Sequence, residues 1–145
     1  MHGMELTFDL VNDAATRTLG ARIAALLRVG DVIALHGDLG AGKTTLTRGL
    51  VQALCGADEE VPSPTYTLVQ SYDAPQFPIW HFDLYRMNTP DEVMELGWDE
   101  TQGGVALIEW PERAGRYLPT ARLDLTLEMV GEQRRARLEP VGEDW

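Results

Sequence analysis

The chain has 145 residues, of which 44% are hydrophobic, enough for one core and a single domain over residues 1–145. It carries 23 acidic and 12 basic residues and a net charge of −11, which argues against tight direct binding to DNA or RNA and favours a basic protein partner. No apolar run is long enough to span a bilayer and no signal-peptide pattern precedes the first helix, so we expect no membrane span. A single cysteine, Cys55, fits a cytoplasmic protein.

The first third of the sequence predicts a strand, a helix and a second strand. Residues 5–10 alternate weakly, as an edge strand does. Asn12 is a suitable N-cap for the helix that follows. The apolar side chains of that helix are expected on one face: Leu19, Ile23, Leu26 and Leu27. Residues 32–35 form a short apolar run that predicts a buried strand.

Residues 37–44, Gly-Asp-Leu-Gly-Ala-Gly-Lys-Thr, match the phosphate-binding loop pattern G-x-x-x-x-G-K-[ST] at every fixed position. Small residues let such a backbone curl so that its N–H groups surround an anion. Lys43 supplies a charge for the β- and γ-phosphates, and Thr44 a hydroxyl for Mg²⁺. Residues 45–54 predict a helix whose N-terminus favours anions. The motif predicts a bound nucleotide; the alternative is a glycine-rich turn that happens to precede a lysine.

The rest of the chain predicts one loop, one helix and five strands. The loop covers residues 56–65, and residues 75–78 form a hairpin-like connection. A helix is expected from Thr89 to Gly97, opening with a capping box that includes Glu92. The expected strands cover residues 66–72, 79–85, 104–109, 123–128 and 135–138. This order predicts an α/β fold, a P-loop domain with a mixed, mainly parallel sheet flanked by helices.

Two acids are candidates for the second metal ligand that a phosphate-binding loop requires. Glu109 follows four apolar residues, as the Walker B acid does at the end of its strand. The alternative for Glu109 is a surface acid at a strand end. Asp83 lies in a strand of mixed polarity, and its alternative is an outward-facing residue paired with Arg86.

Other polar and aromatic residues have weaker signals. Thr65 lies in a proline-rich loop, where nucleotide hydrolases often carry a hydroxyl that senses the γ-phosphate, although such loops are commonly only turns. Trp110 is either a packing aromatic or a lid, and Arg113 either reaches phosphate or lies on an exposed surface. His81 has no partner cysteine and no metal-ligand spacing, so we interpret it as a structural or supporting residue.

Absent motifs narrow the class of phosphate-loop protein. The chain has no D-x-x-G and no [NT]-K-x-D, which argues against a guanine-specific GTPase. It is too short for a motor or an AAA-type ring subunit, and it has little room for the arginine-rich lid of a small-molecule kinase. A compact ATPase is the class that remains.

Taken in order, four segments resemble the TsaE family, also called YjeE: residues 37–45, 63–69, 81–86 and 108–113. The resemblance implies a small P-loop ATPase of the pathway that makes threonylcarbamoyladenosine at adenosine 37 of tRNAs that read ANN codons. It implies a complex with TsaB and TsaD, through which tRNA is contacted indirectly. In that family, ATP binding and hydrolysis are thought to reset the complex between turnovers.

The resemblance also implies roles for individual residues. ATP would be held by Lys43 and its neighbours in the loop: Asp38, Leu39, Gly40, Ala41, Gly42, Thr44 and Thr45. Mg²⁺ would be bound by Thr44 and Glu109. Asp83 would be a catalytic or metal-linked acid, Thr65 would lie in a switch-like loop, and Trp110 and Arg113 would lie at the nucleotide edge.

Two alternatives to this ATPase remain open at the level of the sequence. One is a small-molecule kinase that uses the same loop, although no acceptor motif is evident. The other is a nucleotide-gated binding module whose hydrolysis is incidental. No water-activating glutamine or arginine finger is visible in the sequence, so we expect slow turnover by the chain alone and faster turnover with partners.

Overall fold

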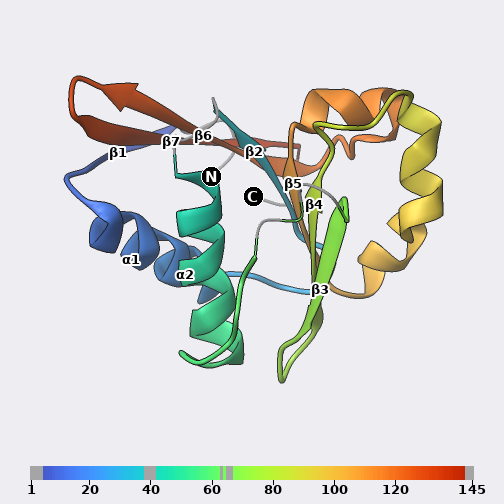
Figure 1. The fold of residues 1–145 in the computed structure, drawn as a ribbon, viewed down its shortest axis with the longest axis horizontal. Coiled ribbons are helices and arrows are strands. Elements are labelled where there is room, and N and C mark those ends of the chain that lie inside the picture. Colours follow the sequence, from blue (N-terminus) through green and yellow to red (C-terminus); the bar gives the residue numbers. More distant parts are fainter. Residues whose placement is uncertain (1–4, 38–41, 63, 65–66, 143–145) are drawn as a thin grey trace.

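The architecture is one seven-stranded mixed sheet with helices on both faces (Figure 1). It comes from a computed structural model that describes residues 5–37, 42–62, 64 and 67–142. The strands are β1 (Leu6–Leu10), β2 (Val32–His36), β3 (Val69–Asp73), β4 (Pro78–Asp83), β5 (Val105–Glu109), β6 (Arg122–Val130) and β7 (Gln133–Val141). Their order is β1-β7-β6-β2-β5-β4-β3. The pairs among β6, β2, β5 and β4 are parallel, and the outer pairs are antiparallel, so the mixed, mainly parallel sheet is confirmed in its centre.

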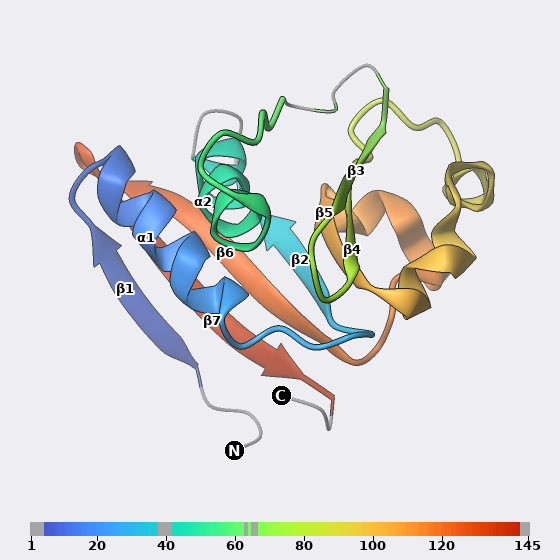
Figure 2. The same cartoon turned by 90° about the horizontal axis from the view of Figure 1, so that it is seen from below.

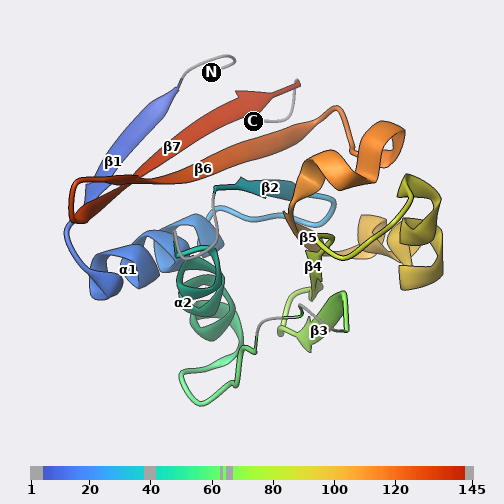
Figure 3. The ribbon, with the colours of Figure 1, turned by 45° about the horizontal axis from the view of Figure 1, so that its top comes forward.

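Two α-helices lie together along one face of the sheet, α1 (Asp13–Ala24) and α2 (Lys43–Cys55) (Figures 2 and 3). Three 3₁₀ helices pack beside β4 and β5: η1 (Pro90–Leu96), η2 (Trp98–Gly103) and η3 (Pro111–Tyr117). Because side chains alternate along a strand, β2 contributes to both cores. Ile33 and Leu35 pack in the cluster beneath α1 and α2, whereas Val32 packs with Phe82 and Ile108 in the other.

Two glycines let the α-helices approach each other closely. A Cβ on Gly20 of α1 would collide with the carbonyl oxygen of Leu46, and a Cβ on Gly49 of α2 would collide with that of Arg17. Backbone therefore meets backbone at this crossing. Since α2 begins at the end of the phosphate-binding loop, the crossing also fixes where that loop meets the sheet.

Most predicted elements are confirmed, with shifted ends. The Asn12 side chain caps α1 by accepting from the Ala15 N–H at 2.8 Å. Leu26 was expected on the buried face, but it is 73% exposed because α1 ends at Ala24 and the helical periodicity stops. The helix expected from Thr89 is 3₁₀ rather than α, and its Glu92 carboxylate accepts from the Thr89 N–H at 2.7 Å.

Two further differences concern elements outside the phosphate-binding loop. The helices η2 and η3 had no counterpart among the predicted elements. Strand β3 begins only at Val69, because Leu68 has a positive φ of 68° that interrupts the extended backbone. Within the described part of the chain, no helix has the length and apolar character needed to cross a membrane.

Candidate nucleotide-binding site

The site lies where β2, β4 and β5 end beside the N-terminus of α2. Parallel strands bring their carboxyl ends to the same edge of a sheet, and ligands of open α/β sheets bind outside that edge. Glu109 is the register partner of Leu35 on one side and of Asp83 on the other. Alternation places both acids on the sheet face that α2 covers, as shown by Leu107, two positions before Glu109, and by Ile79, four positions before Asp83.

Lys43 is the first residue of α2, and its ammonium group is enclosed by the site. The side chain is only 5% exposed, and Nζ donates to the Gly37 carbonyl oxygen at 2.7 Å. Nζ also lies 3.9 Å from Oε1 of Glu109 and 4.3 Å from the centre of the Trp110 ring. Gly42 supplies the left-handed turn before the helix, with a φ of 101°. A poorly solvated cation at a helix N-terminus is a strong attractor for phosphate.

The Glu109 carboxylate has a second partner on the neighbouring strand. Its Oε2 lies 2.6 Å from Nε2 of His81, a side chain with no exposed surface. The two carboxylate oxygens therefore have different neighbours, His81 on one side and Lys43 on the other. The alternative reading of Glu109 as a surface acid is wrong, since Glu109 is 4% exposed.

Asp83 faces inward beside Glu109. It is 5% exposed, and its Oδ1 accepts from the Tyr85 N–H at 3.1 Å, which holds the chain as it leaves β4. The alternative in which Asp83 points outward from the sheet is therefore wrong. A buried carboxylate next to the metal-ligand candidate is suited to orienting water or metal at the phosphate end of a nucleotide.

Trp110 forms a wall of the site from an unusual backbone conformation. Its φ is 56° and its ψ is 52°, in the left-handed region that non-glycine residues rarely adopt. Its ring packs against Tyr85 at 4.8 Å between centres, and the Arg113 guanidinium lies 5.9 Å from the centre of the Tyr85 ring. Trp110 thus contacts Lys43, whereas the ring contact of Arg113 is with Tyr85.

The remaining predicted residues divide into two groups. Thr44 and Thr45 lie in the first turn of α2, beside Lys43. Asp38, Leu39, Gly40, Ala41 and Thr65 lie outside the described residues, so their proposed roles stay predictions. A small cavity of about 140 Å³ opens beside the loop and is lined by Leu35, His36, Gly37, Lys43, Trp110 and Glu112. A larger cavity of about 510 Å³ lies by the opposite ends of the strands, near Gly30 and Val32, and no predicted site residue lines it.

One residue beside the loop was not selected from the sequence. Arg134 of β7 lies against Gly42, where a Cβ would come within 3.0 Å of its guanidinium group. It is held there by Asp13 at 2.6 Å and Thr16 at 3.3 Å. The available signal was the basic run at residues 134–137 in a strongly acidic chain.

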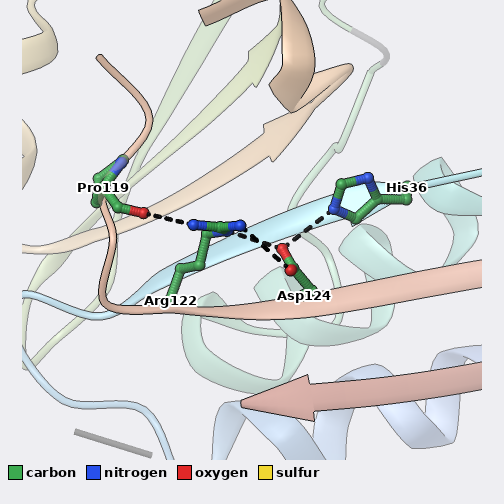
Figure 4. A network of polar contacts seen from close by, with 4 residues as sticks. All are labelled: His36, Pro119, Arg122 and Asp124. Carbon is green, nitrogen blue, oxygen red and sulfur yellow. Dashed lines mark hydrogen bonds and ion pairs between the residues drawn. The ribbon is translucent and has the colours of Figure 1, made fainter. Parts of the chain in front are cut away.

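A second polar group lies at the end of β2, on the face that carries Val32 rather than Leu35. His36 contacts the Asp124 carboxylate at 3.1 Å, and Arg122 donates to the same carboxylate at 2.9 Å (Figure 4). Arg122 also donates to the Pro119 carbonyl oxygen at 3.0 Å. This network ties β2 to β6 immediately before the phosphate-binding loop, on the face away from Glu109.

The donor set fits Mg²⁺ bound together with a nucleotide. No group of three or more histidine, cysteine or acidic side chains is placed to hold a metal within the described ranges. Mg²⁺ commonly uses one or two protein oxygens and completes its shell with phosphate oxygens and water. The Thr44 hydroxyl and the Glu109 carboxylate are the residues suited to that task.

Comparison with known proteins gives a consistent result over nearly the whole chain. Residues 10–137 match the family model described as "Threonylcarbamoyl adenosine biosynthesis protein TsaE". A tRNA threonylcarbamoyladenosine biosynthesis protein TsaE from Rickettsia felis is 39% identical over 127 residues, covering 87% of this chain and 74% of the relative. Its Bacillus subtilis namesake is also 39% identical, over 133 residues, covering 90% and 82% respectively. The crystal structure of Bacillus subtilis YdiB superposes with a TM-score of 0.81 at 33% identity, covering 98% of this chain and 89% of that one.

Proposed function

The chain belongs to the TsaE family, and on that premise we propose that it is the ATP-binding and ATP-hydrolysing protein of tRNA threonylcarbamoyladenosine biosynthesis. The observation that carries the proposal is the enclosure of Lys43 by Gly37, Glu109 and Trp110 at the sheet edge where Asp83 also ends. A buried cation, two buried carboxylates and a helix N-terminus make up most of what phosphoryl transfer requires.

In this proposal Lys43 exchanges its bond to the Gly37 carbonyl for bonds to the β- and γ-phosphates of ATP. Lys43 already lines the cavity beside the loop. By the motif, the backbone of residues 38–45 would supply further N–H donors, and the positive end of the α2 dipole would face the phosphates.

Mg²⁺ would be held by Thr44 and Glu109, and when bound it neutralises charge that develops on the phosphates. Glu109 presents Oε1 toward that side, since Lys43 is its neighbour there. Asp83, one strand further along and also buried, would accept a hydrogen bond from the water that attacks the γ-phosphate.

The biological role we propose is resetting of a TsaB–TsaD complex between turnovers, with tRNA contacted only through that complex. The net charge of −11 agrees with a protein partner and disfavours a nucleic-acid backbone. Turnover is expected to be slow for the chain alone and faster in the complex, where a partner can supply groups that this chain lacks. A cytoplasmic location is part of the proposal.

Reconstitution tests this role. The protein is mixed with TsaB, TsaD, tRNA, ATP and the threonylcarbamoyl donor, and modified adenosine is counted over many turnovers. We expect turnover to continue only when this protein and hydrolysable ATP are both present. Many turnovers without the protein would refute the reset role, and a phosphorylated small-molecule acceptor would indicate a kinase instead.

Two variants separate hydrolysis from nucleotide-gated binding. Lys43→Ala should weaken ATP binding and complex assembly together. Glu109→Gln should weaken only the Mg²⁺-dependent part of ATP binding, so that at saturating ATP and Mg²⁺ the complex still assembles but hydrolysis and multiple turnover stop. If Glu109→Gln supports normal multiple turnover, the protein acts as a gated binding module and hydrolysis is incidental.

A further inference from the structure

We propose that His81 is a positioning residue that sets the orientation of the Glu109 carboxylate and thereby the affinity of the site for Mg²⁺. The inference rests on the proposed function, because it concerns the metal that accompanies ATP. The observation behind it is the 2.6 Å contact between Nε2 of His81 and Oε2 of Glu109 inside the protein.

The sheet register explains how the two side chains meet. His81 of β4 is the register partner of Leu107, so Glu109 lies one step diagonally along the neighbouring strand on the same face. His81 therefore lies beneath Asp83 and Glu109, on the side away from the strand ends. From this position it cannot reach the phosphates in place of Glu109, but it can hold Glu109 from below.

In the hydrogen bond between these two side chains, His81 is the donor and Glu109 is the acceptor. A metal-binding carboxylate is ionised and only accepts hydrogen bonds, so we assign His81 the tautomer whose Nε2–H donates to Oε2. That bond occupies one carboxylate oxygen and stops the group from rotating. The other oxygen, Oε1, is left facing Lys43 at 3.9 Å, which is the side of the incoming phosphates. A ligand already fixed in its binding orientation loses less conformational freedom when the metal arrives.

Core packing alone does not account for a histidine at this position. The Nδ1 atom of His81 is buried and has no hydrogen-bond partner among the residues that the structure describes. A buried polar atom without a partner typically costs about 1–3 kcal/mol, a cost that an apolar side chain of similar size avoids. The bond to Glu109 is the interaction that offsets this cost, so the histidine is explained by what it does to that carboxylate.

The test measures how ATP binding depends on Mg²⁺ concentration in the wild type and four variants. Binding of a non-hydrolysable ATP analogue is measured by calorimetry at each Mg²⁺ concentration. His81→Leu keeps the volume and removes the donor. His81→Gln keeps a side-chain N–H near the Nε2 position, whereas His81→Asn has an amide too short to reach Glu109. Ile79→Val is the packing control, since Ile79 is fully buried on the same face of the same strand.

We expect the Mg²⁺ concentration that gives half of the maximal Mg²⁺-dependent ATP binding to rise about tenfold or more in His81→Leu and His81→Asn. It should stay near the wild-type value in His81→Gln and Ile79→Val. Nucleotide affinity measured without Mg²⁺ should change less than about twofold in all four variants, because Lys43 is untouched. Rescue by glutamine but not by asparagine is a result that a merely structural role would not produce.

The results that would overturn the positioning role of His81 differ from the result that would refute the proposed function. A folded His81→Leu or His81→Asn with the wild-type Mg²⁺ dependence overturns the positioning role while ATP binding by the wild type stands. If His81→Leu does not fold, the comparison of His81→Gln with His81→Asn decides, and equal Mg²⁺ dependence overturns the role. A wild-type protein that binds no nucleotide refutes the proposed function itself.

Discussion

Asp83 and Glu109 are register partners at the carboxyl ends of the parallel strands β4 and β5, and both side chains are buried beneath α2. Glu109 has a contact with Lys43 of 3.9 Å and a contact with His81 of 2.6 Å. Asp83 instead accepts from the Tyr85 N–H. Two neighbouring carboxylates with different partners are suited to different tasks in one reaction.

The first prediction separates these tasks. Asp83→Asn should lower the rate of ATP hydrolysis about 100-fold or more, with Mg²⁺-ATP affinity changed only a few-fold, because asparagine keeps the shape but is a poor base. Glu109→Gln should instead reduce the Mg²⁺ dependence of nucleotide binding. Phosphate release in the partner complex and calorimetry give the two readouts. If Asp83→Asn hydrolyses ATP at the wild-type rate, a residue other than Asp83 orients the attacking water.

The second prediction concerns Trp110. Its ring lies 4.3 Å from the Lys43 ammonium, which must turn toward the phosphates when ATP binds. Tryptophan fluorescence should therefore change on ATP binding, and Trp110→Phe should lose most of that change. Affinity should fall by no more than about thirtyfold, since such cation–ring contacts contribute roughly 0.5–2 kcal/mol. The matched control is Trp98→Phe, which alters a buried ring far from the loop; loss of the signal there instead would contradict the assignment.

The third prediction concerns the crossing of α1 and α2. Gly20→Ala and Gly49→Ala each place a methyl group against a backbone carbonyl oxygen that cannot move independently. We expect the free energy of unfolding to fall by about 1–3 kcal/mol, and more if the helices cannot separate. ATP affinity should fall as well, since α2 carries Lys43.

Gly103→Ala is the control for these substitutions. Gly103 has no heavy atom within 4 Å of an added Cβ, and its φ is not in the left-handed region. Its stability, followed by chemical denaturation, should be close to that of the wild type. Equal effects at Gly103 and Gly49 would show that close helix packing is not the cause.

The fourth prediction concerns alkaline pH. Burial, aided by Glu59, raises the pKa of the Tyr72 phenol above its ordinary value of 10.0, and burial likewise raises the pKa of the Cys55 thiol above 9.0. Both groups keep their protons longer in the folded than in the unfolded chain. Their contribution to stability is therefore complete at neutral pH and is lost as pH rises past 9 and then 10.

Tyr72→Phe tests this directly. The Tyr72 hydroxyl is buried and without a hydrogen-bond partner in the described part of the chain, so its removal should leave stability at pH 7 equal or higher by about 1 kcal/mol. Above pH 10 the variant should lose less stability than the wild type. Denaturation curves from pH 7 to 11 measure both effects, and a parallel decline of the two proteins would contradict the assignment to Tyr72.

The sequence alone determined the parts of this protein that depend on neighbouring residues. Residues 32–44 specify a buried strand, a phosphate-binding loop and a helix start because alternation, glycine and the lysine-threonine pair all act within a few positions. Glu109 could be selected because an acid after an apolar run predicts a strand end. Leu26 was wrongly assigned to the buried helix face, because the periodicity of apolar residues does not show where a helix ends.

Only the tertiary structure decided which side chains meet across the sheet. The pairing of Asp83 with Glu109, the bond from His81 to Glu109, and the placement of Arg134 against Gly42 all join residues far apart in the chain. Strand order and register follow from how the whole core packs, and a shift of one residue would turn His81 and Asp83 to the opposite face. The sequence therefore identifies the ligand class, while packing selects the residues that hold it.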